Sequence, residues 1–160
     1  MTMTDKTQTG RRGLLGKLAM MGLSLPALAA ARPAAAEASP AKPKHRTAAY
    51  HISDHTRAIK MMRNLGAHRA ADANAELVVV AFGGGVDFLL DGAMDEHGNS
   101  YESIVDTHVA AGVKFRVCNN TLVARQISRE QLLPDVEVVP SGVAELTRLQ
   151  CDEGAAYIKP

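Results

Sequence analysis

Cys118 is the residue of this sequence best placed to do chemistry. It ends an apolar stretch predicted to be a strand over Val113–Cys118, and Asn119 or Asn120 can cap a helix that follows it. A cysteine at the carboxyl end of a strand faces the first amides of such a helix. Their dipoles favour the thiolate, which is the nucleophilic form. The pattern therefore predicts an activated thiol, accessible at the edge of a sheet.

Two neighbours bear on this interpretation. Alternation along the strand places Arg116 on the same face as Cys118, where a cation would lower the thiol pKa further. The second cysteine, Cys151, stands beside Asp152 and Glu153, which disfavour a thiolate, so we expect it to be a spectator. Two alternatives stay open: Cys118 as a small buried apolar residue, and a Cys118–Cys151 disulfide.

His51 ends another predicted strand, Thr47–Ile52, and is a candidate base or proton donor for Cys118 at the same edge of the sheet. The alternative is a polar residue that only closes the strand. His51 and His55 have the i, i+4 spacing of a metal pair. They fall on different predicted elements, however, and a pair on one helix face is what a metal needs, so we expect no metal.

Three consecutive glycines, Gly83, Gly84 and Gly85, follow the buried strand Glu76–Phe82. Backbone amides in such a turn can cradle an anion, or the glycines can simply leave room near the sulfur. The spacing of a dinucleotide fingerprint is missing, and no P-loop lysine follows. We therefore expect no nucleotide cofactor.

Strands and helices alternate about five times at short spacing. This pattern predicts an α/β fold, a three-layer α/β/α arrangement with a mainly parallel sheet of about five strands. Asn99, with Glu102 three residues later, predicts a capping box for one helix, and Ser141 predicts the cap of the last. The predicted elements are strands over 47–52, 76–82, 113–118, 136–139 and 155–158, with helices after Asp54 and over 86–90, 100–111, 119–126 and 141–150.

The first 36 residues have the composition of a signal peptide. The basic residues Lys6, Arg11 and Arg12 precede a mostly apolar run over Leu14–Ala31, and A-x-A sequences follow it. The paired arginines are typical of a twin-arginine signal. We therefore predict export to the periplasm, a flexible linker over residues 37–47, and one domain over 48–160 without stable membrane anchoring after cleavage.

Charge excludes one class of partner. The whole chain carries +1, with 18 basic and 17 acidic residues. Removal of residues 1–36 takes away five basic residues and one acidic residue, which leaves 13 against 16. A mildly acidic domain without a basic run offers no binding surface for nucleic acid.

Several segments resemble the DsrE/DsrF-like family of sulfur-relay proteins. The segment GVKFRVCNNTLVA, residues 112–124, carries most of the likeness, and VEVVPSGVAELTRLQ and the terminal AAYIKP follow in the family's order. YHISD and VVVAFGGGV match more loosely. The resemblance implies a flavodoxin-like fold and a homo-oligomer, a trimer or hexamer. It also implies that Cys118 carries sulfur as a persulfide between donor and acceptor proteins.

Three functions therefore compete. The first is a sulfur carrier, an enzyme only in the sense of a sulfurtransferase-like carrier. The second is a small-ligand-binding module with a structural Cys118 and a pocket lined by His51, the glycines and Asn119. The third, a flavin-binding electron carrier, is disfavoured because Asp54 lies in the first strand-to-helix turn, where a phosphate would bind.

Overall fold

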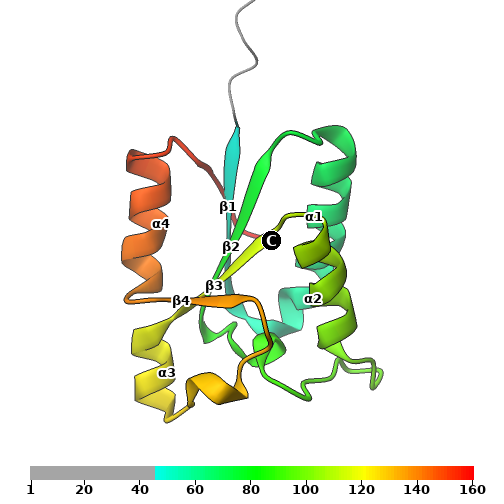
Figure 1. Cartoon of the computed structure of the whole chain (residues 1–160), viewed down its shortest axis with the longest axis vertical. Helices are drawn as coiled ribbons and strands as arrows, with labels where there is room; N and C mark the ends of the chain where they lie inside the picture. The colour runs from blue at the N-terminus through cyan, green and yellow to red at the C-terminus, as the bar shows by residue number, and fades with distance from the viewer. Residues whose placement is uncertain (1–45) are drawn as a thin grey trace, which may run out of the picture. The chain divides into compact units, whose positions relative to one another are not determined.

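The computed structural model describes residues 46–160 (Figure 1). The predicted signal peptide and nearly all of the predicted linker lie outside these residues. Within the described part, no helix is both long and apolar enough to cross a membrane. The strands are β1 (Thr47–Asp54), β2 (Glu76–Gly84), β3 (Lys114–Cys118), β4 (Val136–Val139) and β5 (Ala156–Ile158). The helices are α1 (Ala58–Ala71), α2 (Tyr101–Ala110), α3 (Asn119–Arg125) and α4 (Gly142–Cys151), with short 3-10 turns η1 (His55–Arg57), η2 (Asp87–Leu89) and η3 (Arg129–Gln131).

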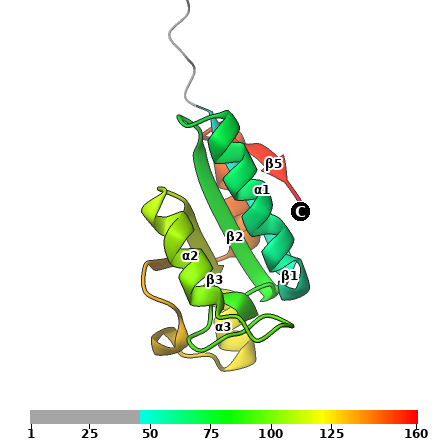
Figure 2. The ribbon, with the colours of Figure 1, turned by 90° about the vertical axis from the view of Figure 1, so that its right-hand side faces the viewer.

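The five strands form one parallel sheet in the order β4-β3-β2-β1-β5. Helices α1 and α2 lie over one face of the sheet, and α4 covers the other (Figures 1 and 2). The predicted three-layer α/β/α fold is therefore confirmed. Because all strands are parallel, their carboxyl ends meet at one edge, and the loops that follow β1, β2, β3 and β4 start there.

The sheet is buried on both faces, as the apolar sequence of β2 predicts. Leu77, Val79 and Ala81 point into the larger core beneath α1 and α2, while Val78 and Val80 point into a smaller core beneath α4. All five of these side chains are fully buried. This burial on alternate faces locks the register of β2, since a slip of one residue would exchange the two sets.

The helix starts differ in part from the prediction. Ser141 caps α4 as expected, and its hydroxyl accepts a hydrogen bond from the amide of Ala144. The predicted cap at Asn99 is wrong: Ser100 caps α2, because the Asn99 side chain donates to the carboxylate of Asp95 instead.

The first residue of α3 also differs from the prediction. Neither Asn119 nor Asn120 caps this helix, because both already lie within its first turn. Cys118 occupies the N-cap position itself, with extended backbone angles. The last residue of β3 is thus also the residue from which α3 begins, which brings its sulfur close to the start of the helix.

Candidate functional site

Cys118 lies where two helices begin. It is the last residue of β3 and pairs in register with Val139, the last residue of β4. Helix α3 starts directly after Cys118, and α4 starts at Gly142, just beyond β4. Adjacent parallel strands that end at the same level therefore bring the N-termini of α3 and α4 to one sulfur atom.

The donors around this sulfur lower its pKa. Burial of Cys118 alone would raise the thiol pKa, but hydrogen bonding from the amide of Gly142, from the amide and hydroxyl of Thr121 and from the amide of Asn120 outweighs that effect. The neutral thiol is a weak acceptor and makes no conventional capping hydrogen bond. These donors therefore act chiefly on the thiolate, whose charge they stabilise.

Close packing at Gly142 makes this approach of α4 possible. A Cβ atom at this position would lie 3.1 Å from Cβ of Cys118 and only 2.8 Å from Cδ1 of Phe82. Any larger residue would force the start of α4 away from the sheet. The glycine thus permits the backbone amide of α4 to come within reach of the sulfur.

Thr121 connects the thiol to the glycine turn. Its hydroxyl oxygen accepts a hydrogen bond of 3.1 Å from the amide of Gly83, while its own proton is directed to the sulfur. Gly83 has a left-handed φ of +57°, and a Cβ on Gly85 would collide with the carbonyl group of Ile52. The glycines therefore let β2 turn sharply against β1, with the Gly83 amide engaged by Thr121.

Arg116 does not act on the thiol. It shares a face with Cys118, as alternation predicts, but its guanidinium binds Glu145 of α4 at 2.6 Å and Glu137 of β4 at 2.8 Å. Glu145 in turn pairs with Arg148 at 2.8 Å. Hydrogen bonds from Arg148 and the charge of Arg116 hold the pKa of the Glu145 carboxyl below its usual value, against the effect of burial. Arg116 thus anchors α4 to the sheet.

His51 is buried but does not meet Cys118. Its ring stacks on Phe82 with a centroid distance of 4.3 Å, and its Nδ1 forms a 2.7 Å hydrogen bond with the hydroxyl of Tyr157. Strand β2 separates β1 from β3, which places the two strands about 10 Å apart. The Phe82 ring fills the space beside His51, so the imidazole has no direct path to the sulfur.

The pocket expected for a ligand-binding module is assembled differently. A hollow of about 490 Å³ adjoins His51, and Ser53, Arg57 and Lys159 also line it. The three glycines and Asn119 take no part in it. The side-chain oxygen of Asn119 instead accepts a 3.3 Å hydrogen bond from Arg129, and Asn120 is exposed.

Both cysteines are free, so the structure contains no Cys118–Cys151 disulfide. Cys151 is exposed at the end of α4, whereas only 5% of Cys118 is exposed. The prediction of an accessible thiol is therefore wrong for the single chain, because the first turn of α4 lies directly against the cysteine. A reactant reaches the sulfur only if this rim opens.

Sequence reasoning missed three residues of the site: Thr121, Gly142 and Phe82. Thr121 carries a usable signal, since it stands three residues after an N-cap, where the backbone amide faces the capping side chain. Phe82 lies in β2 and Gly142 follows β4, the two strands that flank β3 in the sheet. Their role follows only from the order of strands in the sheet, which the sequence does not state.

Comparison with known proteins identifies the family of this chain. A model of the DsrE/DsrF-like family matches residues 38–160, which is most of the sequence. The chain belongs to the DsrE/DsrF-like family. No curated protein sequence matches it significantly.

Two solved structures illustrate the relationship of this DsrE/DsrF-like chain. A protein of unknown function, MTH1491 from Methanobacterium thermoautotrophicum, is 32% identical and superposes with a TM-score of 0.62. The ychN protein from E. coli is 18% identical, with a TM-score of 0.59, and supports the fold alone. Each comparison covers 72% of this chain and 99% of the other. Family and fold together suggest a role in sulfur relay in general.

Proposed function

We propose that this protein is a periplasmic sulfur carrier that holds sulfane sulfur as a persulfide on Cys118. The observation that carries the proposal is the set of donors around this sulfur, which come from the starts of α3 and α4 and lower its pKa despite burial. A thiolate, not a thiol, attacks sulfane sulfur.

Loading is a thiol exchange without net oxidation. The Cys118 thiolate attacks the terminal sulfur of a donor persulfide, so a new sulfur–sulfur bond forms at Cys118 and the donor's sulfur–sulfur bond breaks. The donor leaves as a thiolate and takes up a proton from solvent. In this structure the attacking sulfur is oriented by the amides of Gly142 and Thr121.

During unloading, the same hydrogen-bond donors stabilise Cys118 as the leaving thiolate instead of the attacking one. An acceptor thiolate attacks the terminal sulfur of the Cys118 persulfide, and Cys118 departs as a thiolate. A leaving thiol with a lower pKa departs faster. The hydrogen bonds that lower the Cys118 pKa therefore favour both the attack and the release, as a carrier requires.

Burial of Cys118 fits a carrier that must not lose its cargo. A persulfide exposed to solvent would react with any passing thiol, whereas the rim formed by the first turn of α4 restricts access. We infer that the rim opens transiently, which lets a small persulfide or an acceptor thiolate reach the sulfur. Val123 of α3 and Val143 of α4 are 70% and 62% exposed, and they are apolar residues on the two helices whose N-termini lie at the sulfur of Cys118.

These exposed valines also support the proposal that the protein is a homo-oligomer, a trimer or hexamer. Large apolar side chains at 60–70% exposure are well suited to cover by a second copy. Multi-angle light scattering on the mature protein tests this directly. A mass of one chain at micromolar concentration would contradict it.

The periplasmic location rests on Arg11 and Arg12 and the apolar run behind them. Replacing both arginines by lysine should retain the precursor in the cytoplasm, because the twin-arginine receptor reads the pair. Fractionation with antibody detection measures this. Normal periplasmic delivery of the double variant would contradict the assignment.

The decisive experiment for the carrier is sulfur loading followed by mass spectrometry. The purified mature protein is incubated with glutathione persulfide, desalted, and its intact mass compared before and after treatment with a reductant. We expect one added sulfur atom, located on the Cys118 peptide and removed by the reductant. Cys151→Ser should load normally, and Cys118→Ser should not load. Sulfur found only on Cys151, or no loading at all, would overturn the proposal.

A further inference from the structure

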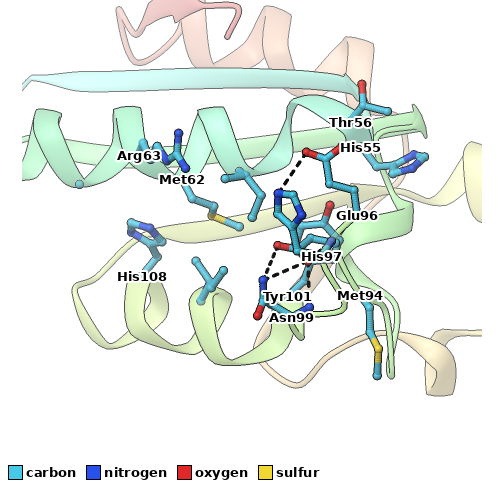
Figure 3. A pocket seen from close by; sticks show the side chains of 14 residues that line it. His55, Thr56, Met62, Arg63, Met94, Glu96, His97, Asn99, Tyr101 and His108 are labelled. Carbon is cyan, nitrogen blue, oxygen red and sulfur yellow. Dashed lines mark hydrogen bonds and ion pairs between the residues drawn. The ribbon is translucent and has the colours of Figure 1, made fainter.

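A second concave site lies on the opposite face of the sheet from Cys118. It is a groove of about 860 Å³ between α1 and α2, closed at one end by the loop over residues 94–99 (Figure 3). Its lining residues Met62 and Tyr101 belong to the core that includes Phe115 and Val117, which point away from the Cys118 face. The sulfur site and this groove are therefore separated by the sheet itself.

The floor of the groove is apolar. Ile59 and Met62 of α1 face Tyr101 and Ile104 of α2, and Met94, 64% exposed, lies at the rim. The volume is in the range of pockets that hold small organic molecules, roughly 300–1,000 Å³. An apolar body of that size would cover the half-buried Ile59 and Ile104 and the exposed Met94.

Gly66 keeps the groove open. It lies within α1, lines the groove and has no left-handed backbone angle that would require glycine. A Cβ there would meet only Cε1 of His108, at 3.9 Å, which is ordinary contact. Glycine inside a helix costs roughly 0.5–1 kcal/mol relative to alanine. The backbone therefore does not require glycine at this position, and the lack of a side chain there leaves the groove open.

Arg63 supplies the charge of the groove. Among residues 46–160, no carboxylate forms an ion pair with its guanidinium, although it lines the groove (Figure 3). The two carboxylates of the lining are engaged elsewhere. Asp95 accepts hydrogen bonds from the amide of His97 and from the amide and side chain of Asn99.

The second carboxylate, Glu96, pairs with His97 at 3.6 Å and has an 87% exposed side chain, so water screens it strongly. His108, beside Gly66, is half-buried, and burial lowers its pKa. Its imidazole is thus neutral near pH 7 and offers one N–H donor close to the apolar floor. The groove combines an apolar floor, a neutral donor and an unpaired guanidinium.

We propose that the groove between α1 and α2 binds a small organic anion with an aromatic or branched apolar body. The body lies against Ile59, Met62 and Ile104, and the carboxylate or sulfonate binds Arg63. A planar guanidinium can hold either group through two parallel hydrogen bonds. This site is independent of sulfur transfer at Cys118.

The test uses two fluorescent probes of nearly the same shape. 1-Anilinonaphthalene-8-sulfonate carries the anion, and N-phenyl-1-naphthylamine has the same aromatic body without it. We expect both to bind the wild-type protein, the sulfonate more tightly. Arg63→Gln should weaken the binding of the sulfonate probe by at least about tenfold, which is the loss expected when a hydrogen bond to a charged group is removed. The same substitution should change the affinity for the neutral probe by less than about twofold, because that probe has no anion to bind Arg63. Arg57→Gln, on η1 outside the groove, is the matched control.

A second pair of variants tests the location. Gly66→Leu should weaken the binding of both probes, because its side chain would occupy the part of the groove beside His108, while Gly66→Ala should retain binding. Both should fold at least as well as wild type, because Gly66 is exposed and helical, and circular dichroism checks this. An equal loss of affinity for both probes in Arg63→Gln would overturn the proposal. So would undiminished binding in Gly66→Leu.

Discussion

The backbone amide of Gly142 faces the sulfur of Cys118, although the two residues belong to different strand-to-helix turns of the chain. The register of β3 and β4 creates this relationship, since Cys118 lies opposite Val139 and both strands end together. The acidity of the thiol thus depends on the assembly of the sheet as well as on the segment that follows the cysteine.

Gly142→Ala should raise the Cys118 pKa. The new Cβ would lie within 2.8 Å of the Phe82 ring and 3.1 Å of Cys118 Cβ, so the start of α4 must move away. We expect the alkylation rate of Cys118, measured against pH in a Cys151→Ser background, to shift its midpoint upward. Overpacking should also cost about 1–3 kcal/mol of unfolding free energy.

Gly66→Ala is the matched control for that variant, because it also replaces a helical glycine but its Cβ makes only an ordinary contact, at 3.9 Å from Cε1 of His108. It should leave the alkylation profile unchanged and raise stability by roughly 0.5–1 kcal/mol. An unchanged midpoint in Gly142→Ala would remove Gly142 from the set of donors.

Thr121→Val should raise the Cys118 pKa as well, and should also destabilise the protein. The variant removes a hydroxyl that is directed to the sulfur and leaves the Gly83 amide without its 3.1 Å partner. An unsatisfied donor that is fully buried costs about 1–3 kcal/mol, and Gly83 is half-buried, so we expect a loss near the lower end, about 1 kcal/mol. Chemical denaturation and the pH profile of alkylation measure the two effects. Thr121→Ser keeps the hydroxyl, so its alkylation midpoint and its unfolding free energy should both stay close to those of the wild type.

Arg116→Met should leave the alkylation midpoint of Cys118 unchanged, since this guanidinium is held by Glu137 and Glu145. Stability should fall by about 2 kcal/mol. That is less than for an isolated buried pair, because Arg148 still neutralises Glu145. Lys114→Met, on the same strand, removes an exposed pair with Glu76 and should cost under about 1 kcal/mol. A raised midpoint in Arg116→Met would show that its charge acts on the thiol.

His51 should make the protein sensitive to acid. Burial, with the charge of Lys159 as a smaller cause, lowers the pKa of His51 in the folded state. The unfolded chain then binds more protons than the folded one as pH falls below about 6.5, so stability decreases there. His51→Phe, which can keep the stacking on Phe82, should reduce this loss.

The measurement for that variant is the unfolding free energy at a series of pH values from 7 downward. His97→Gln, in an exposed loop, serves as the control and should follow the wild-type curve. A His51→Phe protein whose stability falls as steeply with acid as the wild type would refute a neutral, buried His51.

Much of the fold could be predicted from local pattern. The continuous apolar run of β2, the serine before α4 and the glycines after α2 and α4 each act within a few residues, so their effects are legible in the sequence. The cap of α2 does not follow from local sequence, because Asn99 and Ser100 are both good capping residues and the choice between them depends on Asp95.

The candidate site was only half predictable for a different reason. The position of Cys118 between strand and helix is a local feature that the sequence predicts. Whether His51 reaches Cys118 depends on which strand lies between β1 and β3, and spacing along the chain carries no such information. Burial of the cysteine likewise comes from α4, which belongs to a distant segment.

Because α3 and α4 both begin at one sulfur, the pKa of the Cys118 thiol also depends on whether the chain has folded completely. Before β4 joins the sheet and α4 docks, Cys118 has the donors of Asn120 and Thr121 but lacks the amide of Gly142. An incomplete chain therefore presents a less acidic thiol that α4 does not yet bury. The full lowering of the thiol pKa, together with its burial, appears only when β4 and α4, residues 136–151, are in place, so a shielded thiolate marks a completed sheet.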